Sequence, residues 1–183
     1  MTGRFEVQLA GEGGQGLILA GVILAEAAAV YDGLNATQTQ SYGPEARGGA
    51  SKSEVVISDG EIDYPKVIEA DCLLAMSQEA CDKYVGHLKR DGVLIVDSVH
   101  VTRLPLGRQA VQAPITQLAE EATGRRITAN VVALGVLVGT TGAVSRGAIE
   151  AAVRARAPKG TEEVNVTALT AGLDWAEQQR ATL

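Results

Sequence analysis

Cysteine is scarce in this sequence, and its scarcity excludes several classes of site. Only Cys72 and Cys81 occur among 183 residues, with no Cys-x-x-Cys pair. Zinc ribbons and ferredoxin-type clusters need several closely spaced cysteines, and disulfide frameworks are typical of small secreted domains. We therefore expect a protein of the reducing cytoplasm, with Cys72 in the core and Cys81 on a helix.

Aromatic residues and positive charge are also scarce. Aromatics make up 3% of the chain, and 16 basic residues stand against 22 acidic ones, for a net charge of −6. Nucleic-acid-binding domains typically have a basic surface with stacking aromatics, so we expect no nucleic acid as a partner. The longest apolar run, residues 17–30, is interrupted by Glu26 and is too short to cross a bilayer, so we expect no membrane partner either.

The length and the order of the patterns predict one α/β domain, residues 1–183. Strands are expected at residues 4–10, 35–40, 53–58, 72–76 and 93–97, and helices at residues 17–31, 77–90, 114–122, 130–138, 145–157 and 161–179. Such alternation is typical of a doubly wound, mostly parallel sheet with helices on both faces. The C-terminal third is helical, with a helical extension expected over about residues 129–183.

A glycine-rich turn follows the first predicted strand and opens the first predicted helix. Gly11, Gly13 and Gly16 have the spacing of the dinucleotide fingerprint. There the first glycine permits a tight turn, the second lets backbone N–H groups approach a phosphate, and the third lets helix and strand pack closely. However, residues 35–40 lack the usual acidic ribose partner, and Glu12 adds a negative charge. The turn therefore predicts either an anion site or close packing against another chain.

A second candidate site is the irregular stretch of residues 41–49. Arg47 is followed by two glycines and preceded by Tyr42-Gly43-Pro44. An arginine framed by glycines in a loop can clamp a phosphate or a carboxylate. The alternative is an ordinary surface ion pair with Glu45. Loops of this composition more often serve binding than packing.

The sequence contains little that could perform chemistry. No P-loop, HExxH motif or metal-spaced cluster occurs. Asp97, Ser98 and His100 make a weak candidate triad, because they are near neighbours on one segment and no glycine elbow frames Ser98. A nucleotide-type fold without its own catalytic groups predicts a subunit of a larger enzyme.

The two glycine sites together resemble those of a known family. The stretch GEGGQG at residues 11–16, followed by QSYGPEARGGA at residues 40–50, resembles the gamma subunit of 2-oxoacid:ferredoxin oxidoreductases. The segment IDYP at residues 62–65 and Asn130 at the start of an Ala/Leu/Gly helix are also similar, so the resemblance covers nearly the whole chain. The form SYGPEARGG looks more like the 2-oxoglutarate type than the pyruvate type.

The resemblance implies a role in a complex that converts a 2-oxoacid and coenzyme A to an acyl-CoA and carbon dioxide while reducing ferredoxin. It implies that thiamine diphosphate and iron–sulfur clusters are held by partner alpha and beta subunits, with or without a delta subunit. It implies no catalytic or metal-binding residue in this chain, and a place beside coenzyme A. The residues carried over as contacts to coenzyme A or a neighbouring subunit are Gly11, Gly13, Gly14, Gln15, Gly16, Tyr42, Arg47 and Gly48.

Alternatives to the 2-oxoglutarate type remain open from the sequence. One is the related subunit of an indolepyruvate or pyruvate oxidoreductase. Another is an independent NAD- or FAD-binding oxidoreductase, which predicts a cofactor bound to the isolated chain. A third is a pure interaction protein, for which a change at Arg47 would spare turnover once the complex has assembled.

Overall fold

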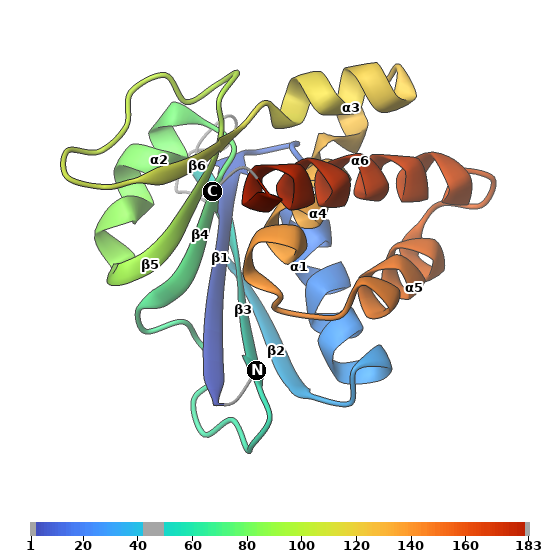
Figure 1. Cartoon of the computed structure of the whole chain (residues 1–183). Helices are drawn as coiled ribbons and strands as arrows, with labels where there is room; N and C mark the ends of the chain where they lie inside the picture. The colour runs from blue at the N-terminus through green and yellow to red at the C-terminus, as the bar shows by residue number, and fades with distance from the viewer. Residues whose placement is uncertain (1–2, 42–49, 182–183) are drawn as a thin grey trace.

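The computed structural model describes residues 3–41 and 50–181. These residues form a six-stranded sheet in the order β2-β3-β1-β4-β5-β6, flanked by helices (Figure 1). The strands are β1 (Arg4–Glu12), β2 (Asn35–Ser41), β3 (Ala50–Ser58), β4 (Ala70–Ala75), β5 (Leu88–Asp97) and β6 (Ala110–Ala113). The helices are α1 (Leu17–Glu26), α2 (Gln78–Tyr84), α3 (Ile115–Thr123), α4 (Ala129–Thr141), α5 (Arg146–Arg156) and α6 (Glu162–Ala181), with short helical turns η1 (Ala27–Tyr31), η2 (Val85–His87) and η3 (Arg126–Thr128).

The sheet is mostly parallel, as predicted. Strands β1, β4, β5 and β6 pair in parallel, and β3 alone runs against its two neighbours β1 and β2. The carboxyl ends of β1, β4, β5 and β6 therefore lie along one edge of the sheet. In open α/β sheets that edge is where ligand crevices form.

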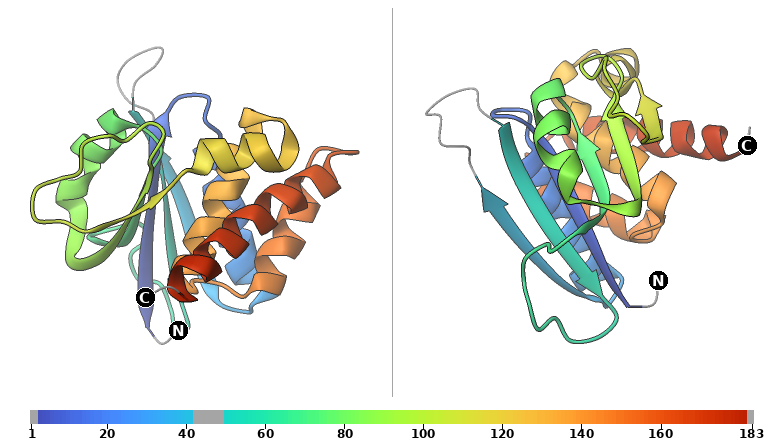
Figure 2. Two further views of the ribbon diagram at one scale, coloured as in Figure 1. Left: turned by 45° about the horizontal axis from the view of Figure 1, so that its top comes forward. Right: turned by 90° about the vertical axis from the view of Figure 1, so that its left-hand side faces the viewer.

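Helices cover both faces of the sheet, but unequally (Figure 2). In β4, Cys72 and Leu74 belong to the larger buried cluster, which also holds α1 and α3–α6, whereas Leu73 and Ala75 belong to the smaller cluster beneath α2. The split follows from the alternation of side chains along a strand. The predicted α/β class with helices on both faces and a helical C-terminal third is confirmed.

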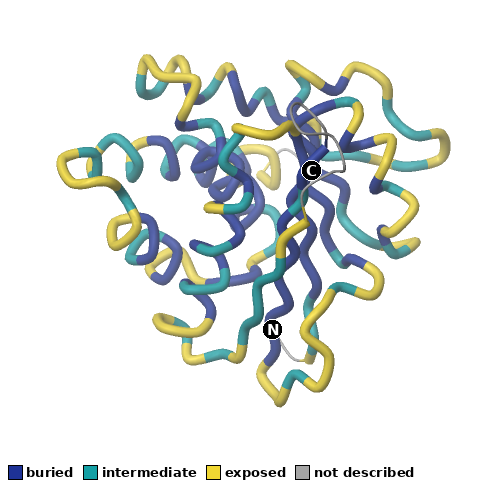
Figure 3. The backbone as a smooth tube through the Cα atoms, turned by 180° about the vertical axis from the view of Figure 1, so that it is seen from behind, coloured by how far each residue is buried: buried dark blue, intermediate teal, exposed yellow. Residues whose placement is uncertain are grey.

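Helix α4 lies at the centre of the larger cluster and is buried from Asn130 to Gly139. Gly135 of α4 and Gly172 of α6 permit a close crossing, because a Cβ on Gly135 would lie 3.0 Å from Gly172 Cα. In Figure 3 the buried stretches run through the middle of the molecule and the exposed ones lie at its rim. In the described part of the chain, we find no helix with the length and apolarity that a bilayer crossing needs.

The predicted end of the second helix is wrong. The helix expected over residues 77–90 ends at Tyr84, and after one further turn β5 already begins at Leu88. Leu88 pairs with Ala70 on β4, and Gly92, just beyond the predicted helix, lies inside β5, where a Cβ would be 3.1 Å from the Ala70 carbonyl oxygen. The Asp91-Gly92 pair thus marks a strand irregularity rather than a helix end.

Candidate functional site

The glycine loop joins the carboxyl end of β1 to the start of α1, as the sequence predicted. Its central side chain, Gln15, fixes the loop to the sheet. Gln15 Oε1 accepts a 2.8 Å hydrogen bond from the Glu12 N–H, and Gln15 Nε2 donates a 3.3 Å bond to the carbonyl of Met76, just beyond β4. The side-chain amide has both its oxygen and its nitrogen bonded within the chain, so we assign Gln15 a structural role in shaping the loop.

The glycines of the loop have different roles, and the turn role expected for Gly11 is wrong. Gly11 is a strand residue paired with Ser51, and a Cβ on it would lie 2.7 Å from Leu17 Cδ1 and overlap the Gln15 side chain. Gly14 and Gly16 adopt φ values of +94° and +76°, which disfavour any side chain.

Gly13 is the informative glycine of the loop. Its φ is not positive, and a Cβ built on it meets nothing within 4 Å. Neither backbone conformation nor packing within the described residues therefore requires glycine at this position. The open space beside Gly13 is where another molecule could approach the backbone closely.

The start of α4 braces the start of α1. Asn130, which is buried, donates a 3.2 Å hydrogen bond from Nδ2 to the carbonyl of Gly16. A Cβ on Gly16 would lie 2.6 Å from that same Nδ2. The predicted close packing of helix against strand at this glycine is therefore wrong, because its close neighbour is Asn130 of α4. The sequence analysis named Asn130 only among the residues that carry the family resemblance and did not predict this contact with Gly16.

The second candidate stretch ends at the start of β3, beside the glycine loop. Ala50, at the start of β3, lies opposite Glu12 in the antiparallel register, and Ser51 Oγ donates a 3.3 Å bond to the Gly11 carbonyl. The predicted site residues Tyr42, Arg47 and Gly48 lie outside the described residues. Their segment is nevertheless attached at the same edge of the sheet.

Two cavities open beside the glycine loop, with volumes of about 340 and 390 Å³. Gly14, Gln15 and Ile127 line both cavities. The Ile127 residue is 82% exposed to solvent. Arg126 and His100 line the smaller cavity and Arg125 lines the larger. The described residues that line the two cavities include no Asp or Glu, so both cavities favour an anion.

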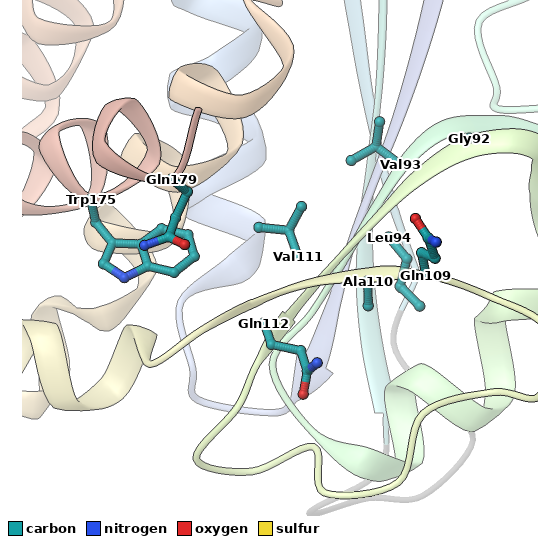
Figure 4. Close-up of a pocket in the computed structure, with 9 residues that line it drawn as sticks. All are labelled: Gly92, Val93, Leu94, Gln109, Ala110, Val111, Gln112, Trp175 and Gln179. Carbon is teal, nitrogen blue, oxygen red and sulfur yellow. The ribbon is translucent and has the colours of Figure 1, made fainter. Parts of the chain in front are cut away.

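A larger cavity, of about 590 Å³, lies elsewhere, between the β5–β6 edge and the end of α6. Figure 4 shows Trp175 and Gln179 of α6 on one side of it and Val111 of β6 on the other. None of the glycine-loop residues lines this cavity, and its walls carry no ionisable side chain among the described residues. The glycine loop therefore remains the better-supported site.

The Asp97-Ser98-His100 stretch does not form a triad. Asp97 is fully buried, and its Oδ2 accepts a 2.5 Å bond from Thr116 Oγ1. His100 Nε2 lies 4.0 Å from Asp97 Oδ2, and no hydrogen bond among the described residues joins His100 to Ser98. His100 instead lines the smaller cavity, at the carboxyl end of β5.

The two cysteines do not fit an iron–sulfur cluster. Both are buried, and Cys72 lies in the cluster on one face of the sheet while Cys81 lies in the cluster on the other. Burial raises the pKa of the Cys72 thiol to about 12, aided by the nearby Asp71 charge, and burial also raises the pKa of Cys81. Cluster ligation needs accessible thiolates that converge on one point.

Fold and site together define an α/β domain with a mostly parallel sheet, whose glycine loop opens onto two cavities without acidic residues among their described linings. The chain belongs to the family described as pyruvate ferredoxin/flavodoxin oxidoreductase, which it matches over residues 6–175. It is 53% identical over 176 residues to the 2-oxoglutarate synthase subunit KorC of Methanothermobacter thermautotrophicus, covering 92% of this chain and 93% of that protein.

Solved structures agree with this assignment. The gamma subunit of a keto/oxoacid ferredoxin oxidoreductase from Geobacter sulfurreducens is 54% identical, with a TM-score of 0.88 over 96% of this chain and 97% of that one. The 2-oxoglutarate:ferredoxin oxidoreductase of Magnetococcus marinus, solved with 2-oxoglutarate, coenzyme A and succinyl-CoA bound, is 25% identical with a TM-score of 0.83. The match covers all of this chain and 32% of that one. The resemblance to a gamma subunit is thereby confirmed.

Proposed function

We propose that this chain is the gamma subunit of a 2-oxoglutarate:ferredoxin oxidoreductase. In that reaction 2-oxoglutarate and coenzyme A give succinyl-CoA and carbon dioxide, and the two electrons released reduce two ferredoxins. The observation that carries the proposal is the 53% identity to a 2-oxoglutarate synthase subunit along 92% of the chain. It is supported by the Magnetococcus complex, which was solved with this substrate and with coenzyme A.

The chemistry would take place on groups held by partner subunits. Thiamine diphosphate would serve decarboxylation and iron–sulfur clusters would carry the electrons, both in the alpha and beta chains, with or without a delta chain. This assignment fits the buried cysteines of the present chain, which do not converge on a cluster site.

The part of this chain in the reaction would be to position coenzyme A. Coenzyme A carries phosphates, and the glycine loop offers an open backbone approach at Gly13 beside a cavity lined by basic side chains. The segment that carries Tyr42, Arg47 and Gly48 is attached beside this loop, because Ala50 lies opposite Glu12. Arg47 would bind a phosphate of coenzyme A or a carboxylate of a neighbouring subunit.

The sheet order argues against the independent dinucleotide-binding alternative. In such domains the acidic ribose partner stands at the end of the strand next to β1. Here β1 lies between the antiparallel β3, whose residues at this edge are Ala50 and Ser51, and β4, which ends at Ala75, while β2 lies one strand further out. No carboxylate among these residues is placed to accept a ribose hydroxyl.

The proposal is tested by purifying the tagged chain from its native host without oxygen. We expect it to bring along subunits that contain thiamine diphosphate and iron–sulfur clusters, and to catalyse viologen dye reduction that needs both 2-oxoglutarate and coenzyme A. Pyruvate and indolepyruvate, tried in the same assay, test the related subunit types. A chain that purifies alone with a bound dinucleotide would overturn the proposal.

A further inference from the structure

The segment IDYP lies in the long connection from β3 to β4, residues 59–69. This connection contains no helix or strand. It lies at the end of the sheet where β1 begins, opposite the end that carries the glycine loop (Figure 1). The proposed coenzyme A site gives it no role, yet side chains of the sheet hold its backbone at several points.

Arg4 and Glu6 of β1 fix this connection to the sheet. They are two positions apart, so their side chains project from the same face of the strand, and Arg4 Nε is paired with Glu6 Oε1 at 2.5 Å. The Arg4 guanidinium also donates 2.7 Å hydrogen bonds to the carbonyls of Tyr64 and Lys66. Glu6 Oε2 accepts a 2.6 Å bond from the N–H of Ile68. Backbone held by charge-assisted bonds has little freedom left to lose when a partner binds.

The apolar side chains of this connection divide into an inner and an outer set. Val67 is partly buried and packs against the smaller core cluster. Tyr64 and Ile68, by contrast, are 49% and 69% exposed. A single exposed apolar side chain is ordinary, but the backbone of both these residues is bonded to the Arg4–Glu6 pair. A fixed loop that presents an aromatic and an aliphatic side chain to solvent is suited to anchoring another protein.

The same connection is acidic. Among residues 59–69 four exposed side chains are carboxylates and one is an amine, namely Asp59, Glu61, Asp63, Glu69 and Lys66. A second copy of this chain is a poor partner for this surface, because a two-fold contact places the same patch, with the same charges, on both sides. Nucleic acids and anionic membranes would be repelled for the same reason. The charge therefore favours a partner whose apolar pocket is bordered by lysine or arginine.

We propose that residues 59–69 form the docking surface for a neighbouring subunit of the oxidoreductase, which presents an apolar pocket with a basic border. Tyr64 and Ile68 enter the pocket, and the carboxylates of Glu61 and Asp63 face its border. The proposal rests on the proposed function for the existence of that subunit, because a gamma subunit has part of its surface covered by other chains. It does not depend on which 2-oxoacid the complex uses.

The docking surface is tested in the complex, purified without oxygen through a tag on this chain. Ile68→Lys places a positive charge against an apolar pocket with a basic border. We expect the amount of the other subunits recovered per soluble tagged chain after dilution to fall about tenfold or more. Tyr64→Ala is the second variant and should act in the same direction. The matched control is Leu106→Lys, which should leave recovery unchanged, because Leu106 is also an exposed apolar residue in a connection, between β5 and β6.

A photochemical crosslink identifies the partner. Tyr64 is replaced by p-benzoylphenylalanine, which keeps an aromatic ring at this position, and the purified complex is irradiated. We expect a crosslink to another subunit, at a segment that contains lysine or arginine. A crosslink to a second copy of this chain, or none to any subunit, overturns the proposal.

The recovery assay separates this proposal from the proposed function. Unchanged recovery with both Ile68→Lys and Tyr64→Ala overturns the docking surface, as does an equal loss with Leu106→Lys. If the wild-type complex is active with 2-oxoglutarate and both variants leave it intact, only the docking surface is contradicted. If the wild-type complex has no activity with 2-oxoglutarate but Ile68→Lys releases its other subunits, only the proposed function is contradicted.

Discussion

Glu12 at the end of β1 and Ala50 at the start of β3 lie opposite each other in the antiparallel register. This pairing brings two stretches that are separated by residues 17–40 in the sequence to the same edge of the sheet. One is the glycine loop, and the other is the segment with Arg47. The register gives a physical reason why the two motifs would act on one ligand.

We predict that Arg47→Ala raises the apparent KM for coenzyme A in the complex by about tenfold, because a charge-assisted bond to phosphate contributes roughly 1.5–3 kcal/mol. Arg47→Lys, which keeps the charge but loses the planar fork, should have a smaller effect. Steady-state kinetics at saturating 2-oxoglutarate measure both. A lower yield of assembled complex with unchanged KM would assign the segment to subunit contact instead.

Asn130→Asp should disturb the glycine loop without changing the size of the side chain. The substitution removes the donor to the Gly16 carbonyl and places a carboxylate beside it, which should lower the free energy of unfolding by about 1–3 kcal/mol. The KM for coenzyme A should rise as well. Asn35→Asp is the control, because Asn35 Nδ2 also donates to a backbone carbonyl, that of Gly60, but at the far end of the sheet. Loss of stability with an unchanged KM would limit Asn130 to packing.

Much of the fold was predictable because local patterns and tertiary packing agree. The alternation in residues 4–10 and the apolar run at residues 93–97 both became buried strands. The start of β5 was not predictable, because Leu88, Lys89 and Arg90 are held in a strand by a distant side chain. Arg108 donates to the carbonyls of all three of these residues. Strand β6, only four residues long, carries too little pattern to be detected.

The candidate site was only partly predictable, for a similar reason. The glycine spacing located the loop, but the contact of Gly16 with Asn130 joins residues 114 positions apart. The convergence of Thr116, Arg126 and His100 on the loop likewise depends on the order of strands in the sheet. Nothing local to these three residues indicates that they share a cavity.

The crossing of α4 and α6 should be sensitive to a single methyl group. A Cβ on Gly135 would lie 2.8 Å from the Leu173 backbone nitrogen, and backbone cannot move aside as a flexible side chain can. Gly135→Ala should lower the free energy of unfolding by about 1–3 kcal/mol, measured by denaturant titration. Gly147→Ala in α5, where a Cβ meets nothing within 4 Å, should be neutral or stabilising by up to about 1 kcal/mol. Equal effects would contradict the close crossing.

The buried thiol of Cys72 should make stability fall at high pH. Its pKa is raised from 9.0 to about 12, so the unfolded chain loses this proton before the folded chain does. The Cys72 thiol therefore leaves the free energy of unfolding unchanged below about pH 9 and lowers it above that pH by about 1.4 kcal/mol per pH unit, up to the folded pKa. The free energy of unfolding at pH 8 and pH 10 should differ less in Cys72→Ala than in wild type. The same pH dependence in both would contradict the assignment.

Gly13→Ala tests the central claim most directly, because neither the backbone conformation nor the neighbours of Gly13 within the described chain require glycine. Gly86→Ala is its control, since a Cβ there also meets nothing within 4 Å and the residue lies in η2, away from the loop. If coenzyme A approaches the loop, Gly13→Ala raises the KM for coenzyme A about tenfold in the complex and leaves the melting temperature unchanged. The control Gly86→Ala leaves both the KM and the melting temperature unchanged. An unchanged KM in a fully assembled Gly13→Ala complex would contradict the claim that this loop receives coenzyme A.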